Sequence, residues 1–459
     1  MCRGAMASRR NGIDYVNIHT DHLHHTSERR TEPVMREPFE IDRDGLDRRR
    51  MLRWLAAGSA LFVSGCGGSS AGEASGAVSV VEAGPTPTPT PTALAPAVPA
   101  PAATPAAATG SADVLNFRSG VSFSTIEGAG DVLPGYLNGQ VFVTPASHFA
   151  YYAGKGMDHI RLEGSWERLQ PRIYGALGEQ LFDHYADAGN PLRNPVALVR
   201  HYLDQAQANG LKVILDLCHN YGERYVGYNG NWSSKSKAQL GSAQVPIGAF
   251  VDYNVKLVQA FGNHPAVIGI ELMNEPHDMA IGEAGWRDAC QKSIDAIRRI
   301  DTRIAIVIDG YGWASAEYWP SRNPTLHTLN DPSNRIIWSA HQYFDASSAG
   351  IYGGGGEKAP SNAQLGVQRL QPFIDWLKRH NFTDRGHIGE FGAPDRSEWS
   401  GIVQNFMTSA RNAGLRLTAH QDVPYLNDAY TMNLFPATDR AGKITGGDRF
   451  IIKTLQAMK

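Results

Sequence analysis

The chain has 459 residues, a formal net charge of −2 and a pI near 6.8, so we expect neither a nucleic acid nor an anionic membrane surface as its partner. Its four cysteines are too few and too scattered for a disulfide framework or a zinc cluster, and we expect no metal or redox cofactor. No apolar run reaches the roughly 18 residues of a spanning helix, so any membrane association is expected only through a lipid anchor.

Residues 1–66 are predicted to be a leader and an export signal. The first fifty are polar and rich in arginine, and we interpret their histidines as part of a solvated tail rather than a metal site. A basic run, Asp47–Arg53, precedes the apolar stretch Trp54–Val63, which is the charged and hydrophobic order of a secretory signal. The paired arginines are similar to a twin-arginine export signal, and plain Sec export stays open.

The apolar stretch ends in Val63-Ser64-Gly65-Cys66, which resembles a bacterial lipobox. We therefore predict lipidation at Cys66 and an exported protein. Its location would be the outer membrane or the periplasm as a lipoprotein, or the medium if Cys66 only follows a cleavage site. Residues 67–112 are rich in Ala, Pro, Thr, Gly and Ser and are predicted to be an unfolded linker, because they hold too little apolar surface to pack.

Residues 113–459 are predicted to be one catalytic domain, a (β/α)8 TIM barrel, because short β-rich runs alternate with helix-length segments. Candidate strands are Gly120–Ile126, Met157–Leu162, Lys212–Leu217, Val267–Met273, Arg303–Ile308, Arg335–Ala340, Gly386–Gly389 and Leu415–Thr418. Candidate helices include Pro195–Asn209, Pro246–Phe261, Gly285–Ile300 and Trp399–Asn412. Gly210 and Gly414 follow two of these helices and lead into the next strand, as C-cap glycines do. An open, doubly wound sheet is the alternative.

Chemistry in such barrels sits at the carboxyl ends of the strands. Polar residues at these ends include Arg161, His219, Asn220, Asn274, Glu275, His341, Tyr343 and Glu390. The carboxylates of strands four and seven, Glu275 and Glu390, would face each other across the barrel mouth, as glycoside hydrolysis requires of an acid and a second carboxylate.

Other carboxylates at these ends are weaker candidates. Glu271 shares side-chain parity with Glu275 but lies about 13 Å deeper along the strand, so we interpret it as a structural partner of a buried arginine. Asp216 and Asp309 also end strands and are interpreted as loop caps.

In these motifs the chain resembles glycoside hydrolase family 5, the cellulase-like members of the clan with catalytic glutamates on strands four and seven. The resemblance covers 115–459. It rests on six motifs in family order: the run ending Arg161-Leu162, Trp166–Pro171, the strand ending His219-Asn220-Tyr221, Asn274-Glu275-Pro276-His277, His341-Gln342-Tyr343 and Glu390-Phe391-Gly392.

The resemblance implies Glu275 as acid/base and Glu390 as nucleophile. It implies that Arg161 and Tyr343 hydrogen-bond the nucleophile, that Asn274 holds the sugar 2-hydroxyl, and that His219 and His341 line the −1 subsite. Asn220 is a further candidate for substrate binding. A cationic Arg161 would also lower the pKa of Glu390, as a nucleophile needs.

Three features depart from the family pattern. Glu163-Gly164 replaces the usual Pro-aromatic step and adds a carboxylate. Cys218 separates Asp216 and His219 by one more residue than usual, which we interpret as a bulge. The eighth strand ends at His420 without the tryptophan that forms the floor of the −1 subsite, and His420 or Tyr425 is the expected substitute.

Loop aromatics are candidates for stacking on sugar rings, with packing against the rim as the alternative. Trp313 is the preferred candidate, and the others are Tyr221, Tyr225, Trp232 and Tyr311. We therefore expect a monomeric, retaining, endo-acting β-glycosidase that acts on a polysaccharide or oligosaccharide, with β-1,4-glucan as its first substrate. Mannan, β-1,3-glucan, a bacterial exopolysaccharide, transglycosylation and a non-catalytic carbohydrate-binding lipoprotein remain alternatives.

Overall fold

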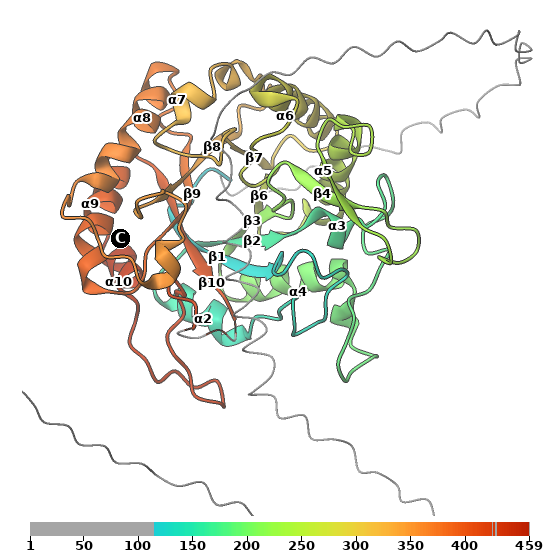
Figure 1. Ribbon diagram of the computed structural model, residues 1–459, viewed down its shortest axis with the longest axis horizontal. Coiled ribbons are helices and arrows are strands. Elements are labelled where there is room, and N and C mark those ends of the chain that lie inside the picture. Colours follow the sequence, from blue (N-terminus) through green and yellow to red (C-terminus); the bar gives the residue numbers. More distant parts are fainter. Residues whose placement is uncertain (1–113, 425, 427–428, 459) are drawn as a thin grey trace, which may run out of the picture. The chain divides into compact units, whose positions relative to one another are not determined.

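The computed structural model describes residues 114–424, 426 and 429–458. Within them, eight parallel strands close into one barrel (Figure 1). These strands are β1 (Ser119–Ile126), β2 (His159–Gly164), β3 (Lys212–Asp216), β6 (Val267–Glu271), β7 (Ala305–Asp309), β8 (Ile336–Tyr343), β9 (Gly386–Gly392) and β10 (Arg416–Asp422). Because β1 pairs with both β2 and β10, the predicted barrel is confirmed and the open sheet is excluded.

Helices surround the strands, as the alternating pattern predicts (Figure 1). The longer ones are α2 (Ala146–Gly154), α4 (Pro195–Ala208), α5 (Ile247–Phe261), α6 (Gly282–Arg298), α8 (Leu365–Arg379), α9 (Ser397–Asn412) and α10 (Phe450–Ala457). Short helical turns are α3 (Trp166–Leu169), η1 (Pro191–Arg193), α7 (Trp319–Arg322), η2 (Leu326–Thr328) and η3 (Tyr352–Gly355). No described helix is long and apolar enough to cross a bilayer.

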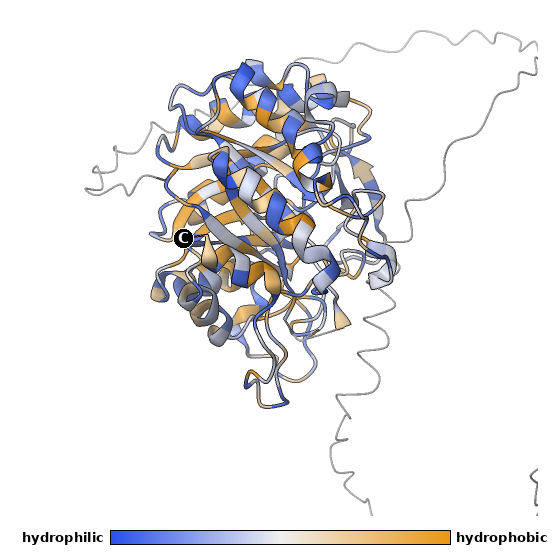
Figure 2. Ribbon diagram, turned by 90° about the vertical axis from the view of Figure 1, so that its left-hand side faces the viewer, coloured by the Kyte–Doolittle hydropathy of each residue, from blue (hydrophilic) through white to orange (hydrophobic). Residues whose placement is uncertain are grey.

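Burial explains why these segments take these forms. The barrel strands are buried on both faces, as in other parallel sheets covered by helices, and apolar residues run through the barrel (Figure 2). Strands β6 and β7 are almost continuously apolar, whereas β2 and β10 also carry polar and charged residues. Each of the longer helices buries an apolar side and exposes a polar one, with its buried residues at helical spacing. Gly210 and Gly414 have φ values of +71° and +77°, so they take the left-handed conformation expected where a helix ends before a strand.

Two features differ from the sequence-based expectation. A small antiparallel hairpin, β4 (Glu223–Val226) with β5 (Ser236–Gln239), follows β3 and was not predicted, because its strands are short and partly polar. The last three barrel strands also run further than predicted, to Tyr343, Gly392 and Asp422.

The barrel interior changes character along its axis. Towards the amino ends of the strands it holds a small apolar cluster that includes Phe117, Ile214 and Val307. Towards the carboxyl ends it is filled by buried charged and polar side chains, among them Arg161 and Glu390. The fold thus gathers the polar ends of separate strands at one mouth. The predicted leader (1–66) and linker (67–112), including Cys66, lie outside the described residues.

Candidate active site

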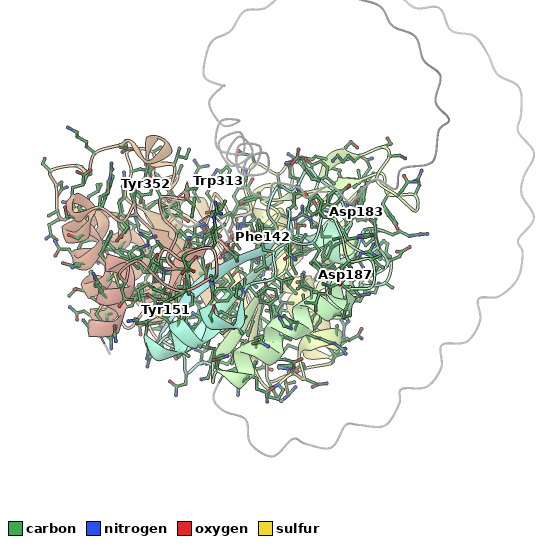
Figure 3. All side chains as sticks on the ribbon, turned by 90° about the horizontal axis from the view of Figure 1, so that it is seen from below. Phe142, Tyr151, Asp183, Asp187, Trp313 and Tyr352 are labelled. Atoms are coloured by element: carbon green, nitrogen blue, oxygen red, sulfur yellow. The ribbon has the colours of Figure 1, made fainter. Side chains whose placement is uncertain are left out.

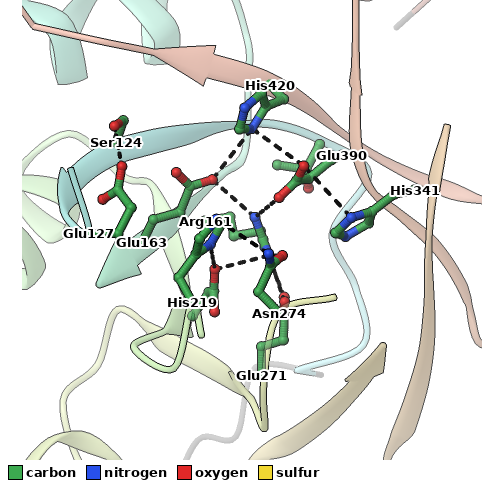
Figure 4. A network of polar contacts seen from close by, with 12 residues as sticks. Ser124, Glu127, Arg161, Glu163, His219, Glu271, Asn274, His341, Glu390 and His420 are labelled. Atoms are coloured by element: carbon green, nitrogen blue, oxygen red, sulfur yellow. Dashed lines mark hydrogen bonds and ion pairs between the residues drawn. The ribbon is translucent and has the colours of Figure 1, made fainter. Parts of the chain in front are cut away.

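Arg161 is the centre of the polar mouth of the barrel. It points inward from β2, is fully buried, and its guanidinium contacts four carboxylates and one amide (Figure 4). These partners are Glu163 (3.0 Å), Asp216 (2.9 Å), Glu271 (2.6 and 2.8 Å), Asn274 (2.6 Å) and Glu390 (2.9 Å). Five neighbours on or just after β2, β3, β6 and β9 therefore share one cation, which holds the ends of these strands together.

Two carboxylates near Arg161 have structural tasks. Glu271 binds the guanidinium through both oxygens, which is the internal partnership predicted for it. Asp216 differs from the loop cap that we predicted, because its Oδ2 atom pairs with Arg161 and also lies 2.6 Å from Nδ1 of His219. Asp216 is therefore part of the charge network at the mouth.

Glu390 lies near the end of β9 and is buried. Arg161 donates to its Oε1, and the hydroxyl of Tyr343 donates to its Oε2 at 2.8 Å. Burial alone would raise the pKa of Glu390, but the charges of His341, His420, Arg161 and His219 hold that pKa well below the ordinary value. Glu390 is thus an ionised carboxylate fixed at both oxygens, as a nucleophile requires.

Glu275 follows β6 on a backbone with φ of +45°, which is rare for a residue with a side chain. Its N–H donates to Oδ2 of Asp309 at 3.0 Å, and its Oε1 lies 2.7 Å from Nδ1 of His341. One carboxylate oxygen of Glu275 lies within 4.8 Å of one of Glu390. The sequence-predicted pair therefore meets across the mouth.

His219 and His341 are two buried histidines of the mouth. Burial opposes the charged form of His219, yet Asp216 and then Glu163 and Glu390 raise its pKa to about 10. His341 lies between Glu275 and Glu390 because the β8–β9 register shifts after Ala340, so that His341 pairs with Glu390. Both side chains reach the space between the catalytic candidates.

Asn274 and Asn220 are placed differently. Asn274 is buried, accepts from Arg161 through its Oδ1, and its Nδ2 lies 3.3 Å from Nε2 of His219, so it faces the mouth as predicted. Asn220 was predicted to bind substrate, but its Oδ1 accepts the Trp166 N–H and its Nδ2 donates to Glu167. Its amide is occupied in holding α3, so we assign Asn220 a structural role.

Aromatic side chains line one side of the acid/base candidate. Trp313, labelled in Figure 3, stacks on the ring of His277 with centroids 3.3 Å apart. The centroid of the Tyr221 ring lies 6.1 Å from that of Trp313. Tyr221 is 37% exposed, so this group offers a face to a ligand. The other predicted aromatics pack elsewhere: Tyr225 against Lys235 and Lys237, Trp232 near Tyr228, and Tyr311 with its hydroxyl on the Met279 carbonyl.

The side chain of the eighth barrel strand that lies beside Glu390 is polar. Nδ1 of His420, in β10, lies 3.6 Å from Oε1 of Glu163 and 3.7 Å from Oε2 of Glu390 (Figure 4). Of the two residues predicted to replace the missing tryptophan, His420 therefore lies beside Glu390. The other, Tyr425, lies outside the described residues.

Glu127, directly after β1, accepts hydrogen bonds from the Ser124 hydroxyl and from the Thr125 N–H. Burial and then the charge of Glu163 raise the pKa of Glu127 to about 7. Glu127 was not predicted from the sequence, although it directly follows β1 at the same end of the barrel.

Cys218 was expected to mark a bulge. The strand β3 already ends at Asp216, and its register irregularity lies between Val213 and Ile214 instead. Cys218 is fully buried in the core beyond the strand, and its carbonyl accepts the N–H groups of Asn220 and Asn274. The additional residue therefore widens the turn that carries His219 rather than distorting the strand.

Three groups of described residues bring carboxylate and imidazole atoms within 4.8 Å of one another, the spacing of a metal site: Glu163 with His219 and Glu390, Glu271 with Asp309 and His341, and Glu275 with His341 and Glu390. Each contains a histidine whose pKa is raised to about 10, and a protonated imidazole cannot coordinate a metal. Arg161 also contacts Glu163, Glu271 and Glu390. The donor atoms are committed to ion pairs and fit a resident metal poorly.

Known proteins are similar to this chain in sequence and fold. The chain is 32% identical to Pseudomonas stutzeri endoglucanase Cel5A, solved in complex with cellobiose, with a TM-score of 0.61 over 74% of this chain and 91% of that one. It is 28% identical to endoglucanase 3 of Humicola insolens over 63% of this chain, and 23% identical to the manganese dependent endoglucanase Eg5A of Phanerodontia chrysosporium over 59%. These two matches span 65% and 62% of the relatives' own lengths.

The family of the chain is shown by a match that covers most of the barrel. Residues 123–427, which include seven whole barrel strands, the second half of β1 and both carboxylates of the pair, match the family described as "Cellulase (glycosyl hydrolase family 5)". The chain is a glycosyl hydrolase and belongs to glycosyl hydrolase family 5.

Proposed function

We propose that this hydrolase is a retaining, endo-acting β-glycanase with β-1,4-glucan as its first substrate. The observation that carries the retaining mechanism is the spacing of Glu275 and Glu390, whose closest oxygens lie within 4.8 Å. Retaining enzymes hold their two carboxyl groups about 5–5.5 Å apart, whereas inverting enzymes leave about 6.5–9.5 Å for a water molecule. A carboxylate this close to its partner favours direct attack on the sugar.

Glu390 and Glu275 act together in each of the two steps of the reaction. In the first, Glu390 attacks the anomeric carbon while Glu275 gives its proton to the departing glycosidic oxygen, which leaves as an alcohol. In the second, Glu275 takes a proton from water, and the oxygen of that water displaces Glu390 from the same carbon. Arg161 and Tyr343 orient Glu390 and keep it ionised before the attack.

The substrate preference is supported by the relatives, which are named as endoglucanases, and by the exposed aromatic group beside Glu275. Mannan, β-1,3-glucan and a bacterial exopolysaccharide contain the same class of bond and are the alternatives. Transglycosylation proceeds through the same glycosyl-enzyme, with a sugar hydroxyl in place of water. Product analysis after incubation with all four glycans separates these substrates, and early release of medium-length oligomers indicates internal cleavage.

The assignment of roles is tested with azide. Glu390→Gly removes the nucleophile and leaves room beside the anomeric carbon, so azide should attack an activated β-glycoside and give the α-glycosyl azide by one inversion. Glu275→Ala should still form the glycosyl-enzyme from a substrate whose leaving group needs no proton, and azide should then give the β-glycosyl azide. The two products are distinguished by NMR. The same anomer from both variants, or near wild-type activity in either, would overturn the assignment.

A further inference from the structure

Asp309 reaches both the backbone and the side-chain partner of the acid/base. It is the last residue of β7 and is fully buried. Its Oδ2 atom accepts the N–H of Glu275 at 3.0 Å and lies 3.3 Å from Nε2 of His341. A single carboxylate oxygen therefore touches the two groups that determine where Glu275 stands and what it faces.

His341 connects Asp309 to the reacting carboxylates. Its Nε2 faces Asp309, while its Nδ1 lies 2.7 Å from Oε1 of Glu275 and 3.6 Å from Oε2 of Glu390. Burial opposes the charged form of His341, but Asp309 first, and then Glu390 and Glu275, raise its pKa to about 10. Asp309 is the largest of these favourable influences, and it is the one that takes no part in bond making.

The backbone at Glu275 also depends on Asp309. A φ of +45° is unfavourable for a residue with a Cβ atom, so it persists only where surrounding contacts hold it. Two contacts do so: Asp309 accepts the Glu275 N–H, and Nδ1 of His277 lies 2.9 Å from the Glu275 carbonyl oxygen.

We propose that Asp309 is a positioning residue, which holds His341 against Glu275 as an imidazolium and fixes the strained backbone from which Glu275 projects. The proposal rests on the function proposed above. When Glu275 passes its proton to the glycosidic oxygen, the carboxylate that forms faces a cation 2.7 Å away.

Several charged and titratable groups face His341. Besides Asp309 on β7, they are Glu271 and Glu275 from β6 and its following turn, and Glu390 and His387 from β9. Only Asp309 can be neutralised without removing a proposed reacting group or the bidentate partner of Arg161. Asp309→Asn is therefore the informative change, because asparagine keeps the size and an oxygen for the Glu275 N–H but removes the charge.

The direct test is the titration of the His341 ring, followed by NMR in the full chain with isotope-labelled histidine. The His341 signal is assigned by its disappearance in His341→Gln. We expect an imidazolium across pH 5 to 8 in the wild type, and a titration about two pH units lower in Asp309→Asn. A neutral His341 ring in the wild type, or an unchanged titration in the variant, would overturn the proposal. The wild-type measurement decides even if the variant does not fold.

Kinetics separate positioning from general support of the fold. Asp309→Asn should lower kcat about 10- to 100-fold with KM nearly unchanged. The matched control is Asp422→Asn, because Asp422 is also a buried aspartate on a barrel strand and lies 2.7 Å from a histidine, His148 on α2, away from Glu275. The control should lower Tm and leave kcat unchanged; equal losses of kcat in both variants would contradict the proposal.

The ring titration requires no turnover, so it remains informative if the glycans assigned above are not substrates. Failure of the function and failure of the Asp309 proposal are therefore distinguishable.

Discussion

Nδ1 of His420 lies 3.7 Å from Oε2 of Glu390, so an imidazole faces the nucleophile from the last strand of the barrel. The same nitrogen lies 3.6 Å from Oε1 of Glu163, which in turn pairs with Arg161. The nucleophile therefore stands above a charged floor where the resemblance leads one to expect an aromatic one. This contact has consequences for both pH dependence and substrate choice.

The acid limb of activity should depend on His420. The charge of His420 is among the influences that lower the pKa of Glu390, so removing it raises that pKa. Because the acid limb of kcat/KM reports protonation of the nucleophile in the free enzyme, His420→Gln should move that limb upward by about one pH unit. His264→Gln, which removes a histidine paired with Asp204, serves as control and should leave the limb in place. Superimposable pH profiles for wild type and His420→Gln would contradict this effect.

The polar floor should make short cellulose oligomers poor substrates. The loss of one stacked aromatic ring removes about 1–3 kcal/mol of binding free energy, by analogy with base stacking on aromatic side chains. We expect low kcat/KM on cellotetraose in the wild type and about a tenfold gain in His420→Trp, measured by product release. Efficient cellotetraose hydrolysis that His420→Ala and Tyr425→Ala both leave unaltered would show that stacking on the eighth strand is not what selects the substrate.

Metal removal should not change the activity. The groups that approach metal-site spacing are held as ion pairs by Arg161 and by histidines with a pKa of about 10. Extensive dialysis against a chelator should leave kcat and KM within about twofold of the untreated protein, since the donors are protonated or already paired. A loss of activity that only Mn²⁺ restores would show instead a site like that implied by the name of the Phanerodontia chrysosporium relative.

Attachment to a membrane is a proposal that rests on sequence alone, since Cys66 lies outside the described residues. An acyl chain on Cys66 adds about 0.8 kcal/mol of membrane affinity for each buried methylene group. Cys66→Ala should therefore move the protein from the membrane fraction to the soluble fraction, measured by fractionation and immunoblotting. Cys218→Ala is a control that changes a buried cysteine of the barrel. Membrane association that persists in Cys66→Ala would refute the lipobox interpretation.

The barrel, and the meeting of Glu275 and Glu390 at one of its mouths, were accessible from the sequence. Strand-length apolar runs alternate with helices, and each run ends in polar residues, so local pattern alone brings Glu275 and Glu390 to one mouth. Glu271 was placed correctly for the same reason, because the two-residue alternation of a strand determines which side chains point inward.

The lateral neighbours of those side chains were decided only by the tertiary structure. Asp216 was interpreted as a loop cap and Asn220 as a substrate contact, because sequence position does not show which charged group stands across the barrel. The contact of Asp309 with His341, and that of His420 with Glu163 and Glu390, join residues from different strands. Such contacts depend on barrel closure and on register shifts such as the one at His341, which are collective properties of all eight strands.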